Sequence, residues 1–124
     1  MHEMALCTEV VKAVIATAEA ADAVSVDEVD MAIGEMRDII VDMFDSFFHY
    51  LARGTIAENS VIAYRAVPLM VRCRQCGETS HPDVGQKDEV HCPACGEHDY
   101  EMIAGNELVI ESIDVTTREE VAAA

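Results

Sequence analysis

Two paired cysteine motifs constrain the fold of this chain more than any other feature. Cys73 and Cys76 form one CxxC pair, and Cys92 and Cys95 form a second, with residues 77–91 between them. This separation matches the C-x2-C-x15–20-C-x2-C spacing typical of zinc sites. Four thiolates complete a tetrahedral shell and leave no open coordination position, so the spacing predicts a structural zinc rather than a catalytic one.

The segment 72–99 around these cysteines differs in composition from its flanks. It holds four of the five cysteines and three of the five histidines, but few aliphatic residues. Such a segment cannot fold by apolar burial, so we expect the metal to hold it together as a separate module. Gly77 and Gly96 should permit the tight return of each turn. Its histidines, His81, His91 and His98, are expected to be solvated loop residues, with ligand exchange or pH sensing at the zinc as the alternative.

Other uses of paired cysteines stay open at this point. Two CxxCG turns also hold the single iron of rubredoxins, which would make the chain an electron carrier, although it supplies no aromatic core around the cysteines. A redox dithiol needs only one pair. A zinc-ribbon adaptor that bridges other proteins, without carrying a cargo, is a further alternative.

The regions on both sides of this segment predict two helices and three strands. Residues 3–22 and 36–54 show helical spacing of apolar residues, and residues 28–35, 60–71 and 106–115 read as strands. The predicted apolar face of the first helix comprises Met4, Cys7, Val11, Val14 and Ala18. That of the second helix comprises Ile40, Met43, Phe44, Phe47 and Leu51.

Three local details complete these predictions. Cys7 lies on the apolar stripe of its helix and is interpreted as a small buried hydrophobic residue. Val29, Met31 and Ile33 should share the buried face of their strand, with Glu28 and Asp30 on the opposite face. Pro68 cannot donate to a strand ladder and therefore marks an edge or a bend.

These elements predict two structural parts and a tail. Residues 1–71 and 100–115 are expected to form one discontinuous α/β domain, into which the zinc module of residues 72–99 is inserted. Residues 116–124 show no pattern of their own and are expected to be a flexible tail.

Charge and absent motifs argue against several classes of function. The chain has 24 acidic against 8 basic residues, a formal net charge of −16, which repels phosphate backbones and argues against nucleic acid as a partner. Charged residues interrupt the Ala-rich first twenty residues, so no signal peptide is predicted, and no segment predicts a membrane span. We therefore expect a cytoplasmic protein. Motifs for nucleotide hydrolysis, serine hydrolases, zinc proteases and dinucleotide binding are absent, and we expect no catalytic activity.

The first three residues, MHE, can be interpreted as a metal-binding end. The terminal amine of Met1, nearby backbone nitrogens and the His2 imidazole can reach one cation, with the Glu3 carboxylate in reach. Such nitrogen-rich tetragonal sets favour Ni(II) or Cu(II), and copper generally binds more tightly, so the residues alone leave the metal open. The bulky second residue should keep Met1 in place. The alternative is a histidine near a chain end without function.

Five segments recur in a fixed order in one known family. They are MHEMAL at the start, IGE at Ile33–Glu35, GTIAE at Gly54–Glu58, the paired CRQCG and CPACG, and GNELVIESIDV near the end. With these segments the chain resembles the HypA/HybF family of nickel metallochaperones, which serve the maturation of nickel–iron hydrogenases. The resemblance extends to about Val115, and MHE and the two CxxCG motifs are its most specific parts.

The resemblance implies a fold and a set of metal ligands. The fold is α+β, a small three-stranded sheet flanked by two helices, with an inserted zinc-ribbon-like module. His2 would be the key nickel ligand, the Met1 amine and nearby backbone amides would complete the set, and Glu3 would assist. The structural zinc would be held by Cys73, Cys76, Cys92 and Cys95. Some relatives have an acidic residue after the IGE segment that approaches the nickel. Ile40 stands near that place here, with Asp38 and Asp42 on either side, so that role is left unassigned.

The resemblance also implies partners. They are a HypB-type GTPase and the hydrogenase large-subunit precursor, and some relatives also serve urease. A second copy of the chain is a further candidate partner, in a homodimer formed for example by exchange of strands between the copies. The resulting hypothesis is a nickel carrier that transfers its cargo without making or breaking bonds in a substrate.

Overall fold

The computed structural model describes residues 2–82 and 91–123, with His2 described by its backbone only. The chain divides into two compact units. The first comprises residues 1–32, 39–65 and 109–124, and the second comprises residues 33–38 and 66–108. The second unit thus contains the described part of the segment 72–99 and extends beyond it on both sides.

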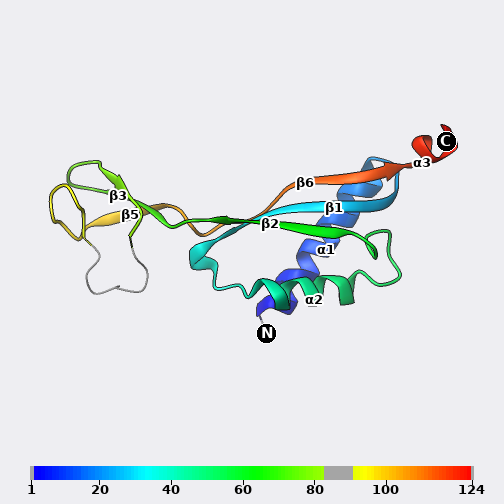
Figure 1. Cartoon of the computed structure of the whole chain (residues 1–124), viewed down its shortest axis with the longest axis horizontal. Helices are drawn as coiled ribbons and strands as arrows, with labels where there is room; N and C mark the ends of the chain where they lie inside the picture. Colours follow the sequence, from blue (N-terminus) through cyan, green and yellow to red (C-terminus); the bar gives the residue numbers. More distant parts are fainter. Residues whose placement is uncertain (1, 83–90, 124) are drawn as a thin grey trace. The chain divides into compact units, whose positions relative to one another are not determined.

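Helix α1 (His2–Ala20) of the first unit confirms its predicted apolar face (Figure 1). Four of the five predicted residues are buried, and Val10 is buried beside them. Apolar side chains spaced at i, i+3 and i+4 form one stripe because these positions lie on the same side of a helix. α1 packs against helix α2 (Val41–Leu51).

Helix α2 begins later than the predicted residue 36. Residues Glu35–Arg37 instead form a short 3-10 turn, and Asp38 follows it with a left-handed backbone conformation, φ 59°. A non-glycine residue in this region interrupts a helix, so the regular helical turns start only at Val41. The helix ends before Ala52, whereas Gly54, the last residue of the predicted helix, lies two residues further on with φ 77°.

The buried face of α2 differs from the predicted one. Phe44 and Phe48, four residues apart, are fully buried, whereas Ile40 and Met43 are 56% and 40% exposed. The predicted face was therefore wrong in part. Residues 40–51 offer two overlapping apolar stripes, and contact with α1 and with the sheet selects the one that contains both buried phenylalanines.

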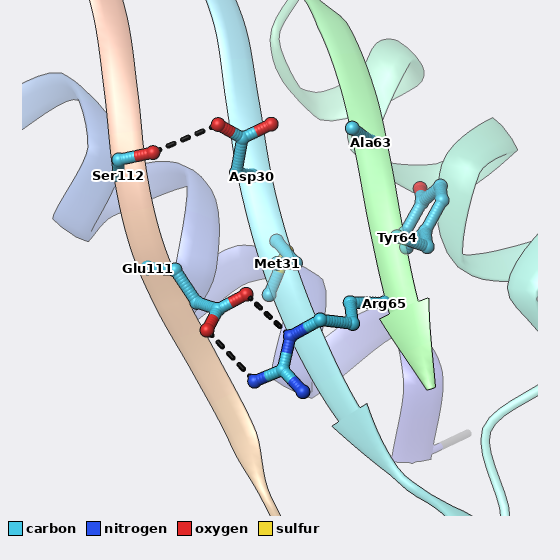
Figure 2. A pocket seen from close by; sticks show the side chains of 7 residues that line it. All are labelled: Asp30, Met31, Ala63, Tyr64, Arg65, Glu111 and Ser112. Atoms are coloured by element: carbon cyan, nitrogen blue, oxygen red, sulfur yellow. Dashed lines mark hydrogen bonds and ion pairs between the residues drawn. The ribbon is translucent and has the colours of Figure 1, made fainter. Parts of the chain in front are cut away.

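The sheet of the first unit has the strand order β2-β1-β6. Its strands are β1 (Ala23–Gly34), β2 (Val61–Val67) and β6 (Leu108–Thr117). Val29, Met31 and Ile33 are buried, as their alternation predicted, but β1 starts five residues earlier than expected. Helices α1 and α2 lie behind the sheet in Figure 2. The three-stranded sheet with these two helices on one face confirms the predicted α+β fold.

The C-terminal residues continue the regular structure. β6 runs to Thr117, and helix α3 (Arg118–Ala123) follows it. The backbone N–H of Arg118 donates to the carbonyl of Asp22 at 2.9 Å, and its Nε donates to the Asp22 carboxylate at 3.1 Å. These contacts attach the start of α3 to the turn between α1 and β1.

The second unit is built on a small antiparallel sheet with the order β4-β3-β5. Its strands are β3 (Met70–Cys73), β4 (Thr79–Ser80) and β5 (Tyr100–Ala104). Pro68 lies between β2 and β3 and outside both strands, in keeping with its inability to donate to a ladder. Gly34, the last residue of β1, and Met36 just after it belong to this unit, and their N–H groups donate to the carbonyls of Glu107 and Gly105.

Candidate metal centres

Each cysteine pair occupies a turn closed by the same two backbone hydrogen bonds. In the first turn the N–H of Gly77 donates to the carbonyl of Cys73, and the N–H of Cys73 donates to the carbonyl of Glu78, both at 2.9 Å. The second turn repeats both bonds at 2.8 Å, with Gly96, Cys92 and Glu97 in the same places. Gly77 and Gly96 have φ values of 77° and 78°, the left-handed region expected of them.

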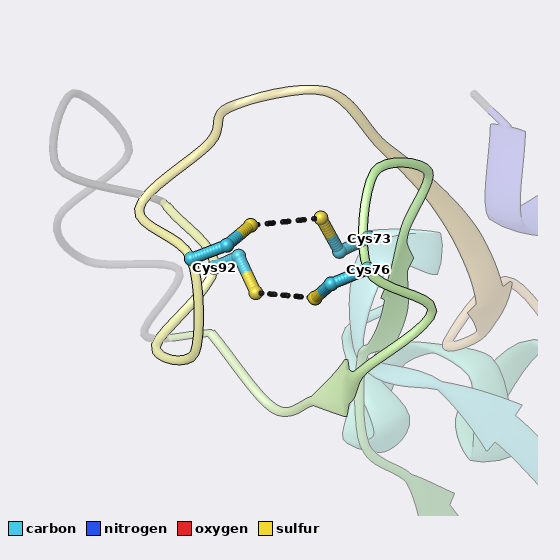
Figure 3. A group of neighbouring side chains, drawn as sticks. Cys73, Cys76 and Cys92 are labelled. Atoms are coloured by element: carbon cyan, nitrogen blue, oxygen red, sulfur yellow. Dashed lines mark hydrogen bonds between the residues drawn. The ribbon is translucent and has the colours of Figure 1, made fainter.

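The two turns face each other and bring four sulfur atoms together (Figure 3). Two close separations run between the turns: Cys73 Sγ lies 3.5 Å from Cys95 Sγ, and Cys76 Sγ lies 3.5 Å from Cys92 Sγ. All four sulfurs lie within 4.8 Å of one another. Sulfurs at about 2.3 Å from a tetrahedral zinc are about 3.8 Å apart, so these four fit a structural zinc.

The surroundings support this ligand set. Backbone N–H groups of Cys95 and Ala94 lower the pKa of Cys92 to about 7, which favours a thiolate at this position. The pKa of Cys95 is raised instead, because a lowering by the backbone at Glu97 is outweighed by desolvation and by hydrogen bonds with the neighbouring sulfurs. Outside the cluster, Arg74 bonds to the Asp99 carboxylate at 2.7 Å, and its N–H donates to the Asp99 carbonyl at 2.9 Å. These contacts hold the first cysteine turn against the start of β5.

The histidines of the second unit stay outside the cysteine group. Nδ1 of His81 lies 2.6 Å from the backbone carbonyl of Leu69 and 4.0 Å from the Glu35 carboxylate. The rings of His91 and His98 meet edge to face, with centroids 6.1 Å apart. Among the described residues, no histidine nitrogen belongs to the group of convergent ligand atoms around the four sulfurs.

The predicted nickel-binding end is described only in part. Met1 and the side chain of His2 lie outside the described residues. The backbone of α1 begins at His2, and Glu3 is the acidic residue of its first turn. The first N–H groups of any α-helix have no intrahelical acceptor, so the backbone nitrogens here are not engaged by the helix itself.

Cys7 follows this end by one helical turn but is not available as a metal ligand. Its side chain is fully buried, and its thiol donates to the carbonyl of Phe44 on α2 at 3.3 Å. Burial, with a contribution from the negative charge of Glu3, raises the pKa of Cys7 to about 11. The residue therefore remains a neutral thiol near neutral pH, as its place on the apolar stripe predicted.

One acidic group on the outer face of the sheet was not predicted from the sequence. Glu28, Asp30 and Asp114 bring carboxylate oxygens within 4.8 Å, and a hydrogen bond with Asp30 raises the pKa of Glu28. The alternation in β1 placed the first two on this face, but only strand pairing brings β6 beside them. Exposed acidic groups of this kind are common without a metal.

A hollow of about 430 Å³ lies beside this group on the same face (Figure 2). Arg65 from β2 and Glu111 from β6 meet across β1 in a two-bond ion pair of 3.1 and 2.8 Å. Ser112 donates to Asp30 at 2.8 Å. These contacts tie the three strands together on the side that the helices do not cover.

The fold and the cysteine site define a class of protein: an α+β protein that carries a four-cysteine, zinc-ribbon-like metal site. None of the described helices is long and apolar enough to cross a membrane. The chain belongs to the HypA family, whose model, "Hydrogenase/urease nickel incorporation, metallochaperone, hypA", matches residues 1–115. This is a family of nickel metallochaperones in hydrogenase maturation. The cysteine cluster fits the structural zinc that was expected as a second metal, in addition to nickel.

Curated relatives and solved structures agree with this membership. A hydrogenase maturation factor HypA from Dehalococcoides mccartyi is 40% identical over 115 residues, covering 93% of this chain and 94% of the relative. A HypA from Methanothermobacter thermautotrophicus is 30% identical over 123 residues, covering 96% of this chain and 100% of the relative. A solution structure of a HypA protein superposes with a TM-score of 0.74 at 18% identity, covering 95% of this chain and 98% of that one. The solution structure of the Ni metallochaperone HypA from Helicobacter pylori superposes with a TM-score of 0.60 at 20% identity. The match covers 90% of this chain and 97% of that one.

Proposed function

We propose that this chain binds Ni(II) through its N-terminus and delivers it to the large-subunit precursor of a nickel–iron hydrogenase in the cytoplasm, with a HypB-type GTPase as partner. The observation that carries the proposal is the family match, because it includes residues 1–3 as well as the four cysteines. The curated relatives are named as hydrogenase maturation factors. Nickel is the cargo in this proposal, and zinc is the resident metal.

The proposed nickel ligands are nitrogen donors gathered at one end of a helix. They are the amine of Met1, the imidazole of His2 and the backbone nitrogens of the first residues, with the Glu3 carboxylate assisting. The start of α1 at His2 supports this set, because its first N–H groups have no acceptor in the helix. Nitrogen-rich sets of this kind suit Ni(II).

The position of the proposed nickel site at a helix N-terminus also favours release of the metal. The N-terminal end of a helix carries a partial positive charge, which disfavours a bound cation. The carboxylate of Glu3 in the first turn offsets part of this effect. A carrier has to give up its cargo, and a site at a helix N-terminus weakens binding without any loss of donor atoms.

Zinc has a separate role in this proposal. The cysteine group offers four sulfur ligands and no position for a fifth group, so it suits a metal that stays in place. The four ligands come from two turns whose residues, apart from Cys73 and Cys92, are exposed. The metal would join these turns. The zinc therefore stabilises the second unit and does not take part in transfer.

Nickel titration of untagged protein tests the proposal. His2→Ala is expected to abolish nickel binding and to leave one zinc per chain, while His81→Ala, in the second unit, should leave both metals unchanged. Equal nickel affinity in His2→Ala and the unaltered protein would contradict the carrier model and favour an adaptor. An absorption spectrum checks the resident metal, because iron–thiolate sites are coloured and zinc sites are not.

A second experiment isolates the terminal amine. Adding Gly-Ser before Met1 moves the amine away from His2 but keeps the imidazole, so nickel affinity is expected to fall at least tenfold. The same two residues added after Ala124 serve as the matched control. Unchanged affinity in the N-terminal extension would show that the amine is not a ligand.

A further inference from the structure

The ring of His49 on α2 lies between two backbone carbonyl groups. Its Nδ1 is 2.8 Å from the carbonyl oxygen of Asp45, one turn earlier on α2, and its Nε2 is 2.8 Å from that of Ser60, just before β2. Ser60 is buried, and both its N–H and its hydroxyl donate to the carbonyl of Ala57. The ring thus joins α2 directly to the segment that leads into β2.

Both partners of the ring are acceptors, which decides its protonation state. A neutral imidazole has one N–H, so it can bond to one carbonyl and turns a lone pair toward the other. Only the protonated ring donates to both. The Ser60 carbonyl accordingly raises the pKa of His49, against a lowering by partial burial, and the Asp45 carbonyl and carboxylate add to the rise.

We propose that His49 is a proton-dependent clamp in the first unit. Its protonated ring fixes the C-terminal half of α2 to Ser60, and loss of the proton releases one of the two contacts and loosens the junction with β2. This device goes beyond metal carriage, because it makes the packing of the first unit depend on pH at a residue that is not among the proposed metal ligands.

The charged groups around the ring favour the protonated clamp. Oδ2 of Asp45 lies 3.4 Å from Nδ1 of His49, and the hydroxyl of Tyr64 on β2 donates to Oδ1 of Asp45 at 2.7 Å. Tyr64 therefore holds the carboxylate beside the ring. The clamp thus has three members, one of them on β2, and the Asp45 carboxylate links the other two.

Other titratable groups on the neighbouring elements do not replace this partner. They are Asp42 on α2, Arg53 and Glu58 in the segment between α2 and β2, and Cys7 on α1. Arg53 is directed elsewhere, since its guanidinium stacks 4.3 Å over the ring of Tyr50 and its Nε donates to the Tyr50 carbonyl. Within the described part of the chain, the Asp45 carboxylate is the acidic group at ion-pair distance from His49.

NMR titration of the full-length, zinc-loaded protein tests the clamp directly. The ring 15N shifts of His49, followed from about pH 5 to 9, are expected to show both nitrogens protonated at the acid end and a midpoint above 6.5. Asp45→Asn keeps a partner for Tyr64 but removes the charge, so it should lower the midpoint. His81→Gln, in the second unit, should leave it unchanged. A midpoint at or below 6.5 in the unaltered protein overturns the proposal.

His49→Gln provides a second readout, because glutamine does not titrate and cannot donate to both carbonyls. Amide exchange at Val61 and Ile62, corrected for its intrinsic pH dependence, should be several-fold slower in the unaltered protein than in the variant at acid pH. This difference should disappear as the pH rises through the raised pKa of His49. A difference that is equal at all pH values would assign His49 a packing role only and would overturn the clamp.

Discussion

Gly34 and Gly105 approach so closely in the second unit that a Cβ atom on Gly34 would overlap the carbonyl group of Gly105. The contact is backbone against backbone, and flanking hydrogen bonds hold it from both sides: the N–H of Gly34 donates to Glu107 and that of Met36 to Gly105, at 2.7 and 2.8 Å. Neither chain segment can move aside without breaking these bonds. The glycine of the IGE motif is therefore required by a close approach, although its own φ of −71° is open to any residue.

We expect Gly34→Ala to destabilise the second unit by about 1–3 kcal/mol, the cost of forcing extra volume into a packed site. Urea unfolding followed through the amide signals of β3 and β5 measures it. Gly54→Asn is the matched control, because Gly54 has φ 77° with open space around its Cβ position, and asparagine tolerates that backbone conformation. Equal stability of Gly34→Ala and the unaltered protein would show that the backbones at Gly34 and Gly105 can move apart to accept a side chain.

The two phenylalanines at 47 and 48 should differ strongly in their effect on stability. Phe48 is fully buried, and its truncation to Ala is expected to cost about 3–5 kcal/mol, whereas half-buried Phe47 should cost clearly less. Chemical denaturation followed by helical circular dichroism compares the variants. If Phe48→Ala does not fold, Phe48→Leu provides the smaller change. The reverse order would restore the face of α2 that the sequence predicted.

Zinc content should depend on Cys73 and not on Cys7. Cys73→Ser removes one of four sulfur ligands, so zinc is expected to be lost and the strands β3, β4 and β5 to lose their protection from exchange. α1 and α2 should persist, because their packing does not involve the cysteine group. Cys7→Ser should retain one zinc per chain by elemental analysis. Loss of both units in Cys73→Ser would contradict the independence of the first unit.

The buried thiol of Cys7 sets a pH dependence. With its pKa raised to about 11 from 9.0, the thiolate fraction at pH 8 is about 0.1% instead of about 10%. Alkylation by iodoacetamide, resolved by mass spectrometry, should therefore be at least about 100-fold slower at Cys7 than in the unfolded chain. Because the unfolded thiol loses its proton first, stability should fall as the pH rises from about 9 to 11. Rapid labelling of the folded protein would show that α1 and α2 separate readily.

Local patterns account for the parts of the structure that could be predicted. A CxxCG turn is closed by hydrogen bonds within six consecutive residues, so its geometry and its left-handed glycine follow from the motif. The stripe on α1 and the alternation of Val29, Met31 and Ile33 likewise depend only on helical and strand periodicity. The family resemblance, whose most specific parts are MHE and the two CxxCG motifs, also implied the three-stranded sheet.

The remaining features depend on contacts between residues far apart in the chain. Two apolar stripes compete on α2, and only packing against α1 and the sheet buries Phe48 rather than Met43. The carboxylate group on the outer face forms because β6 pairs beside β1.

The sequence by itself thus determined the pairing of the four cysteines into one group and the helical stripe of α1, because short-range spacing encodes both, and it indicated the family through ordered segments between Met1 and Val115. Only the tertiary structure decided which face α2 buries, why Gly34 must lack a side chain, and that His49 lies between two carbonyl oxygens eleven residues and four residues away. The physical reason is that these properties arise from volume and hydrogen-bond partners supplied by other elements, which no local pattern specifies.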